Sequence, residues 1–248
     1  MRSWHSFPNS MANLTQLRML EDLDGFLLVD KPEGIAFASV VKAVKRKFNL
    51  VKVGHGGSLD AMASGLLVLL INDANKFVGN VMGADRAYAG TLRLGRTTDT
   101  HDVHGRTLAE RAVSVSPEAL DAALRACRGD IFQTEPRFCA IRREGSAGYE
   151  IADTGDHSQF LSHVYRFQTV PAAADCLAFE LSATKSLIVR TLVNDFGAAL
   201  GCGACLASLR RTRIGKFAVE DAIPFNRLLE TEMKDFAACV LPLSAALR

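Results

Sequence analysis

The chain has 248 residues, and its 29 Lys and Arg against 27 Asp and Glu leave a net charge of only +2. With 48% hydrophobic and 23% charged residues, the composition is that of a globular protein and excludes a disordered chain, a collagen and a coiled coil. The length allows one large domain or two small ones. Because the net charge is so small, binding to nucleic acid would depend on local basic clusters.

No apolar run approaches the roughly 20 residues that cross a bilayer. The longest run, Leu66–Ile71, has the length of a strand. Six cysteines are scattered without the spacing of a disulfide framework, so we expect reduced thiols in the cytoplasm. Residues 1–22 lack the apolar stretch and cleavage site of a signal peptide, and we interpret them as an N-terminal extension.

Apolar patterns along the chain predict both strands and helices. Ser116 before Pro117 is typical of a helix start, and Gly201 is typical of a helix end. Strands and helices follow one another without a regular βαβ rhythm, which favours the α+β class. The sequence predicts strands at 25–30, 65–71, 88–94, 160–170 and 176–182, helices at 40–48, 117–128 and 191–200, a loop at 133–156, a short strand or turn at 207–217, and a helical tail at 231–248.

Three segments resemble cofactor or metal sites and are better explained otherwise. The glycine-rich loop that begins at Gly54 lacks the G-K-[ST] and G-x-G-x-x-G patterns of nucleotide-binding loops. Cys202 and Cys205 form a single C-x-x-C pair, which cannot complete a tetrahedral zinc site by itself. His101 and His104 are explained at least as well by an exposed polar turn. We therefore expect no metal and no cofactor.

One carboxylate, Asp60, stands at the end of the glycine-rich loop and just before the apolar run. Taken alone, it would be interpreted as the cap of a turn or helix. Lys and Arg are concentrated in three short stretches, which usually form solvated surfaces but can also bind phosphates. These stretches span 42–52, 142–143 and 210–216.

The segment at 54–65, GHGGSLDAMASG, resembles the catalytic motif of the TruB family of pseudouridine synthases, G-H-x-G-[ST]-L-D-P-x-A-[ST]-G. Other segments resemble the remaining motifs of that family in the same order, over about residues 25–220. They are GFLLVDKPEG at 25–34, LGRTTDT at 94–100 after Tyr88, QTEPRFCA at 133–140, YE at 149–150, RTL at 190–192, LGCGA at 200–204 and LRR at 209–211.

The resemblance implies an α+β fold with a mixed, largely antiparallel central sheet, flanking helices and an RNA-binding cleft. It implies that the protein isomerises the T-arm uridine of tRNA to pseudouridine after the base has been flipped out of its stack. Atoms are conserved in that reaction, which agrees with the expectation of no cofactor. The expected partner is therefore the T arm of tRNA, and the expected form is a cytoplasmic monomer with no membrane contact.

The resemblance also assigns roles to individual residues. Asp60 aligns with the catalytic aspartate, whose ionised carboxylate could act on the sugar or on the base. Arg190 aligns with an active-site arginine, whose charge would favour the ionised carboxylate. Tyr88 aligns with a base-stacking tyrosine, and His55 aligns with a histidine that fills the place of the extruded nucleotide. The other expected contacts are Leu209 as a wall of the substrate pocket and, for RNA binding, Lys31, Arg142, Arg210 and Arg211.

Three departures from the family motifs lie close to the expected pocket. Gly56 stands where the family has Thr or Ala, and Ala61 stands where it has Pro. Ile188 stands where the family has Tyr. These changes keep an alternative open, namely an RNA-binding, RNA-folding or ribosome-assembly factor of the same fold with weak or no catalysis. An enzyme acting on a different RNA is a third possibility. We divide the chain into an extension at 1–22, a catalytic domain at 23–230 and a tail at 231–248 that leaves no room for the family's PUA domain.

Overall fold

The structure is a computed structural model, and it describes residues 23–134, 136–141, 150–153 and 159–246. The strands of its main sheet are β1 (Gly25–Lys31), β2 (Val53–His55), β3 (Ser64–Ile71), β4 (Arg86–Leu94), β7 (Gly129–Thr134), β10 (Gln159–Ala173), β11 (Cys176–Ala183), β12 (Ala204–Ile214), β13 (Phe217–Ala218) and β14 (Ile223–Pro224). Two small sheets pair β5 (Arg96–Thr98) with β6 (Thr107–Glu110) and β8 (Phe138–Ile141) with β9 (Glu150–Asp153). The α-helices are α2 (Phe37–Lys47), α3 (Val78–Gly83), α4 (Pro117–Ala126), α5 (Val189–Ala199) and α6 (Phe225–Glu230), and short 3-10 helices are η1 (Asn72–Phe77), η2 (Val219–Asp221), η3 (Met233–Cys239) and η4 (Leu243–Ala246).

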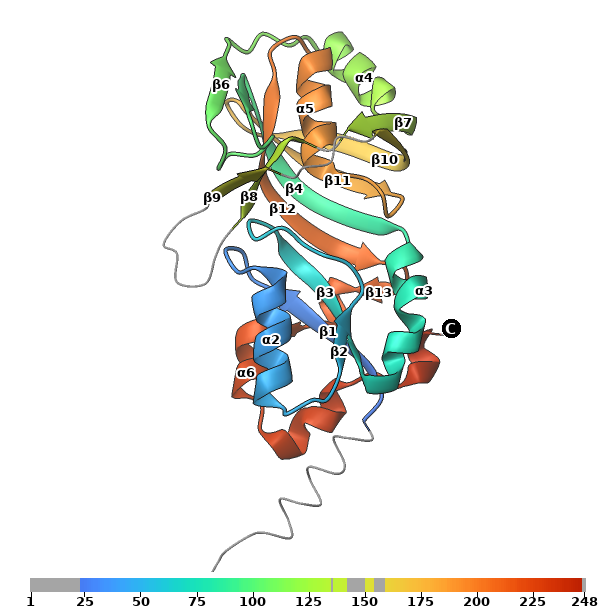
Figure 1. Cartoon of the computed structure of the whole chain (residues 1–248). Coiled ribbons are helices and arrows are strands. Elements are labelled where there is room, and N and C mark those ends of the chain that lie inside the picture. Colours follow the sequence, from blue (N-terminus) through green and yellow to red (C-terminus); the bar gives the residue numbers. More distant parts are fainter. Residues whose placement is uncertain (1–22, 135, 142–149, 154–158, 247–248) are drawn as a thin grey trace, which may run out of the picture.

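The main sheet has the strand order β14-β1-β3-β12-β4-β11-β10-β7, with β2 beside β3 and β13 beside β12. Its pairs are antiparallel except β1 with β14 and β3 with β12. This arrangement confirms the predicted mixed, largely antiparallel sheet of an α+β fold. In Figure 1, β4 and β12 run between an end that carries α4 and α5 and an opposite end that carries α2, α3 and α6.

β3 is apolar along almost its whole length because both of its faces are buried. Leu67, Leu69 and Ile71 pack into one hydrophobic cluster, while Leu66 and Val68 pack into another on the opposite face. Successive side chains of a strand point to opposite faces, so a strand covered on both sides reads as a continuous apolar run. The run predicted as a strand at 65–71 is therefore confirmed.

The helices predicted at 40–48, 117–128 and 191–200 form as α2, α4 and α5, and α2 begins three residues earlier than predicted, at Phe37. The side chain of Ser116 accepts a hydrogen bond from the amide of Ala119 at 3.2 Å and caps α4, with Pro117 in the first turn. α5 ends before Gly201, whose φ of +77° a side chain would disfavour.

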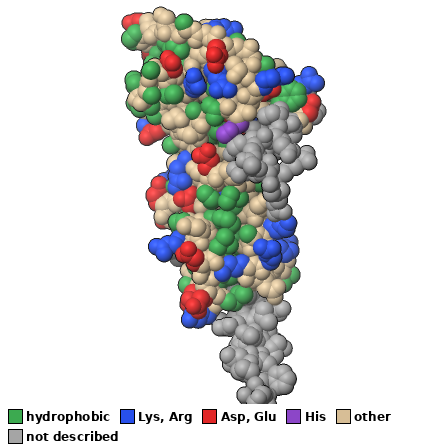
Figure 2. Space-filling view, turned by 90° about the vertical axis from the view of Figure 1, so that its left-hand side faces the viewer, with side chains coloured by type: hydrophobic (Ala, Val, Ile, Leu, Met, Phe, Trp, Pro, Cys, Tyr) green, Lys and Arg blue, Asp and Glu red, His purple; other side chains and the backbone are tan. Residues whose placement is uncertain are grey.

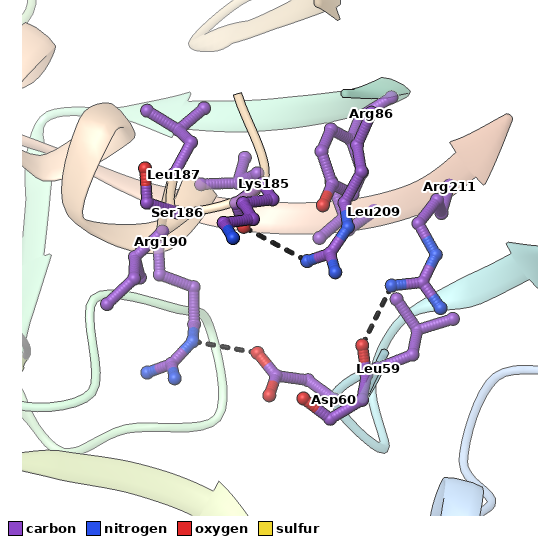
Figure 3. A pocket seen from close by; sticks show the side chains of 13 residues that line it. Leu59, Asp60, Arg86, Lys185, Ser186, Leu187, Arg190, Leu209 and Arg211 are labelled. Carbon is purple, nitrogen blue, oxygen red and sulfur yellow. Dashed lines mark hydrogen bonds and ion pairs between the residues drawn. The ribbon is translucent and has the colours of Figure 1, made fainter. Parts of the chain in front are cut away.

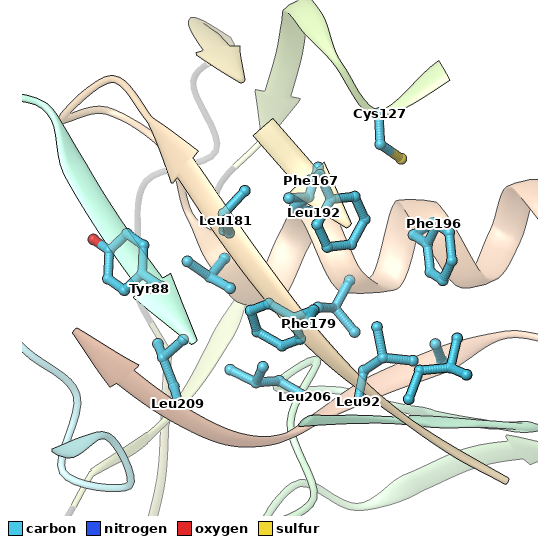
Figure 4. Close-up of a cluster of buried hydrophobic side chains, with 14 of the residues drawn as sticks. Tyr88, Leu92, Cys127, Phe167, Phe179, Leu181, Leu192, Phe196, Leu206 and Leu209 are labelled. Atoms are coloured by element: carbon cyan, nitrogen blue, oxygen red, sulfur yellow. The ribbon is translucent and has the colours of Figure 1, made fainter. Parts of the chain in front are cut away.

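The largest hydrophobic cluster lies between α5 and the sheet. Phe167 stands at its centre, with ring centroids 6.0 Å from Phe179 and 5.4 Å from Phe196 in edge-to-face geometry. Figure 4 shows Tyr88 at the end of this cluster, with its hydroxyl directed away from the other side chains. Tyr88 therefore lies at the edge of the core.

Two predicted segments differ from the structure. The stretch at 133–156, predicted as a loop, contains the end of β7 and the strands β8 and β9. The stretch at 231–248, predicted as a helical tail, forms the 3-10 helices η3 and η4 within its described part and contributes to the core. Phe236 is fully buried and stacks on Phe48 with centroids 3.7 Å apart. The apolar residues of this segment complete the hydrophobic cluster around Phe48. The spacing of apolar residues within 231–248 does not predict this contact.

β3 and β12 meet along a short parallel seam that pairs Arg210 with Ser64 and Arg211 with Gly65. Gly65 has a φ of +100°, and a Cβ at this position would lie 2.3 Å from the carbonyl oxygen of Arg211. Only glycine fits such a close approach of two backbones. The seam brings β12 to the loop that precedes β3. No helix of the described chain is both long and apolar enough to cross a membrane.

Candidate active site

The loop at 56–63, between β2 and β3, carries Asp60 and is held from one side by Arg211. This arginine is 1% exposed. Its Nε donates to the carbonyl of Leu66 at 2.9 Å, and its Nη1 and Nη2 donate to the carbonyls of Ser58 at 2.8 Å and Gly57 at 3.2 Å. Burial lowers the pKa of Arg211 to about 10. The guanidinium thus fixes the backbone just before Asp60.

Lys31 holds the same loop from the other side. Its Nζ donates to the carbonyls of Pro32 at 2.9 Å, Ile35 at 2.7 Å and Ala61 at 3.3 Å. Burial lowers the pKa of its ammonium to about 8, although the nearby charge of Asp60 opposes the shift. Lys31 therefore connects the turn after β1 to the residue that follows Asp60.

Lys31 and Arg211 were expected to contact RNA, and that expectation stays a prediction. Both side chains are buried and use their donors on backbone carbonyls. A buried cation bonded in this way cannot reach a phosphate without leaving its carbonyls unpaired. We assign both residues a positioning role for the Asp60 loop.

Arg190, in the first turn of α5, forms an ion pair with Asp60. The Nε of Arg190 lies 2.9 Å from Oδ2 of Asp60, and its Nη1 donates to the carbonyl of Thr100 at 2.8 Å. The arginine side chain is 8% exposed, whereas that of Asp60 is 44% exposed. A charge-assisted bond to a fixed guanidinium orients the carboxylate while one side of it stays open to a ligand.

A pocket of about 260 Å³ opens beside this pair. Figure 3 shows Asp60 and Arg190 on one side of the pocket and Arg86 with Lys185 on another. The volume lies just below the range of roughly 300–1,000 Å³ that is typical of small-molecule sites. The lining side chains are those of Ser58, Leu59, Asp60, Arg86, Tyr88, Lys185, Ser186, Leu187, Ile188, Val189, Arg190, Leu209 and Arg211.

Tyr88 and Leu209 supply apolar surface to the same pocket. Both are 7% exposed and also belong to the largest hydrophobic cluster. Tyr88 lies on β4 directly opposite Arg211 of β12, and Leu209 lies opposite Gly90. The structure thus brings four of the residues expected at the active site to one cavity: Asp60, Tyr88, Arg190 and Leu209.

His55 does not line this pocket. Its Nδ1 accepts a hydrogen bond from the amide of Gly57 at 3.4 Å, and its ring lies 4.9 Å from that of Phe37. Burial and the charge of Arg211 lower the pKa of His55, which favours the neutral imidazole. Its expected place beside an extruded nucleotide stays a prediction.

The other expected RNA contacts have different surroundings. Arg210 makes two bonds to Asp30, at 2.9 and 2.7 Å, and its side chain remains 41% exposed. Arg142 lies outside the described residues. Figure 2 shows Lys and Arg side chains in several separate groups on one face of the molecule, with hydrophobic side chains between them. On this face, the basic residues do not form one continuous stripe.

Three functional candidates were not assigned a role from the sequence. Arg86 begins β4, Lys185 lies between β11 and α5, and both line the pocket. Gln133 is 1% exposed, and its amide clamps Ile188, accepting from the Ile188 amide at 3.0 Å and donating to its carbonyl at 3.1 Å. The position of Gln133 in the QTEP motif was the only available signal for it.

Three of the residues that resembled metal ligands, or lie next to them in the chain, have other surroundings in the fold. Cys202 and Cys205 are buried, and Cys205 lies in β12. The buried carboxylate of Asp102 accepts bonds from the hydroxyl of Thr100 and the amide of His104, both at 2.9 Å. Burial raises the pKa of Asp102, although these two hydrogen bonds favour the ionised form and oppose the shift. Among the described residues, no three His, Cys, Asp or Glu side chains converge as metal ligands would.

Comparisons with known proteins show the family of the chain. Residues 45–186 match the family model "TruB family pseudouridylate synthase (N terminal domain)", and residues 190–248 match "tRNA pseudouridylate synthase B C-terminal domain". The chain is 36% identical to tRNA pseudouridine synthase B of Aromatoleum aromaticum, covering 90% of this chain and 73% of the relative. It is 37% identical to the protein of that name from Pseudomonas aeruginosa, covering 88% and 72%.

Among solved structures, a Cbf5–Nop10–Gar1 complex contains a chain of similar fold. The TM-score is 0.68 at 24% identity, and the match covers 93% of this chain. It covers 63% of the solved chain, so this protein spans less than two thirds of that length. The family models and the identity with curated relatives show that the chain belongs to the TruB family of pseudouridine synthases.

Proposed function

We propose that this protein converts a uridine in the T arm of tRNA to pseudouridine, with Asp60 as its catalytic carboxylate. The observation that carries the proposal is the Asp60–Arg190 pair at 2.9 Å, with the carboxylate half exposed in a pocket that also contains Tyr88. The curated relatives named above are tRNA pseudouridine synthases, which favours tRNA as the substrate.

The proposed reaction breaks the bond between C1′ of the ribose and N1 of the uracil. The base then turns, C5 bonds to C1′, the proton on C5 leaves, and N1 takes up a proton, so atoms and electrons balance without an oxidant. An ionised Asp60 could begin these steps by attack on the sugar or on the base, and the bond that it forms must break again before the product leaves, which returns the free carboxylate. Arg190, fixed by Thr100, would hold the carboxylate in place throughout.

A uridine inside a stacked stem or loop cannot reach Asp60, so it must be extruded into the pocket. Tyr88 and Leu209 offer apolar surface for its base, and stacking on an aromatic ring is worth about 1–3 kcal/mol per base. The pocket is complete within one chain, which supports action as a monomer. The free thiols of the described cysteines suit a reducing compartment, and we propose the cytoplasm.

The test is the conversion of a T-arm stem-loop RNA by wild type and by Asp60→Asn. Asp60→Asn should remove pseudouridine formation and leave RNA affinity within a few-fold, because the amide keeps the shape of the carboxylate. Asp121→Asn is the control, since Asp121 is exposed on α4 and forms an ion pair with Arg125, one turn along the same helix. Turnover by Asp60→Asn near the wild-type rate would refute the assignment of Asp60. Tight binding without any turnover by wild type would instead favour an RNA-binding factor.

A further inference from the structure

The pocket contains more positive charge than its carboxylate can balance. Arg86, Lys185, Arg190 and Arg211 line it together with the single acid Asp60. Arg190 is paired with Asp60, and Arg211 is buried against backbone carbonyls. Within the described chain, neither Arg86 nor Lys185 forms an ion pair with a carboxylate. Two cations at the pocket are therefore left without a counter-charge.

The fold holds the guanidinium of Arg86 against the backbone of Lys185. Arg86 of β4 pairs with Ala183 of β11, so the chain that leaves β11 passes close to Arg86. The Nη1 of Arg86 donates to the carbonyl of Lys185 at 3.1 Å. The residue after Lys185 is also held, because the hydroxyl of Ser162 donates a hydrogen bond to the hydroxyl of Ser186 at 3.0 Å. The backbone of Lys185 is thus fixed from both directions, and the site is organised before any ligand arrives.

Arg86 has a donor that nothing in the described chain satisfies. Its Nε is buried without a hydrogen-bond partner among the described residues. Its guanidinium lies so near Gly57 that a Cβ there would stand 2.6 Å from Nη2. Figure 3 shows this guanidinium directed into the pocket, across from Asp60. A buried unpaired donor is costly unless a ligand completes its bonding.

We infer that Arg86 and Lys185 form a phosphate subsite for the RNA, which binds a phosphate next to the extruded uridine. This inference rests on the proposed function. The phosphates are the charged groups of an RNA strand, and they remain attached to a nucleotide that leaves its stack. A guanidinium with a neighbouring ammonium offers several charge-assisted donors to one phosphate. Asp60 and Arg190 then remain available to the nucleoside.

The experiment combines protein variants with RNA in which a single phosphate is neutral. T-arm stem-loops carry a methylphosphonate on the 5′ or the 3′ side of the target uridine, and both affinity and kcat/KM are measured. Arg86→Gln and Lys185→Gln remove charge but retain polar side chains, and Lys185 is exposed, so its change does not endanger folding. Arg227→Gln is the matched control, because Arg227 is exposed on α6 and does not line the pocket.

For wild type and Arg227→Gln, the neutral linkage on one of the two sides should weaken binding by about tenfold or more, as expected for loss of a charge-assisted contact. Arg86→Gln and Lys185→Gln should already bind the unmodified RNA more weakly and lose little more with the same linkage. Equal losses for all four proteins at both linkages would overturn the subsite. If this coupling appears in affinity while wild type forms no pseudouridine, the subsite stands and the proposed function fails.

Discussion

Replacing Gln133 tests whether its buried side-chain amide fixes the position of Arg190. Gln133 on β7 bonds to both the amide and the carbonyl of Ile188, the residue from which α5 starts, at 3.0 and 3.1 Å. Arg190 follows two residues later. Replacing Gln133 by Leu retains bulk but leaves the Ile188 amide unpaired, whereas the carbonyl still accepts the amide of Leu192 at 3.1 Å.

The expected cost follows from these bonds. A buried unpaired amide costs about 1–3 kcal/mol and a lost neutral hydrogen bond about 1 kcal/mol, so Gln133→Leu should lower the free energy of unfolding by about 2–4 kcal/mol. With a denaturant slope of about 2–3 kcal/mol per M, the urea midpoint falls by roughly 1 M. Gln133 does not line the pocket, so kcat should fall by about 10- to 100-fold through misplacement of Arg190 while KM changes little.

Two variants make this reasoning refutable. Gln133→Glu retains an acceptor for the Ile188 amide and can donate to the Ile188 carbonyl only when protonated, so its stability relative to wild type should improve as the pH falls. Gln168→Leu is the control, because Gln168 is an exposed glutamine on β10 and its replacement should change stability by less than about 0.5 kcal/mol. A Gln133→Leu protein with an unchanged urea midpoint and unchanged kcat would contradict the proposed clamp.

Three further changes test the scaffold of the site. The pKa of Lys31 is lowered from 10.5 to about 8, so between these values the unfolded chain holds a proton that the folded protein has lost. The free energy of unfolding should therefore gain a contribution that rises with pH across this interval, and comparison with Lys31→Met in urea titrations should show it missing from the variant. Arg211→Met leaves three carbonyls without their donor and should lower stability by about 3–5 kcal/mol; an unchanged melting curve would show that the Asp60 loop is held by other contacts. Phe236→Ala should cost about 3–5 kcal/mol if η3 belongs to the core, and a calorimetric change below about 1 kcal/mol would show that this segment packs only loosely.

Local sequence signals predicted the elements of this fold better than their contacts. The apolar run of β3 and the Ser116 cap of α4 follow from short-range chemistry, and both appear in the structure. The burial of Phe236 depends on a partner, Phe48, far away in the chain, and no local pattern signals it. The short strands β8 and β9 are likewise held by their pairing with each other, because their sequences show no clear alternation.

The candidate site shows the same division. The ordered motifs predicted that Asp60, Arg190 and Tyr88 share a site, and the structure brings them to one pocket. Charge alone could not reveal that Lys31 and Arg211 point inward, because exposure is set by the surrounding fold. Nor could it reveal Arg86, whose place beside Lys185 results from the pairing of β4 with β11.

The short parallel seam between β3 and β12 also determines when the pocket can form during synthesis and folding of the chain. Asp60 and Arg190 are separated by 130 positions, and Ser58 and Arg211 by 153. Contacts of such long sequence separation form late in folding, because large loops must be closed before they contribute. While the chain is being synthesised, β1, α2 and β3 can associate early, but the Asp60 loop has no Arg211 until β12 has been made and has docked. In a nascent chain that ends before β12, the pocket lacks two of its lining residues, Leu209 and Arg211.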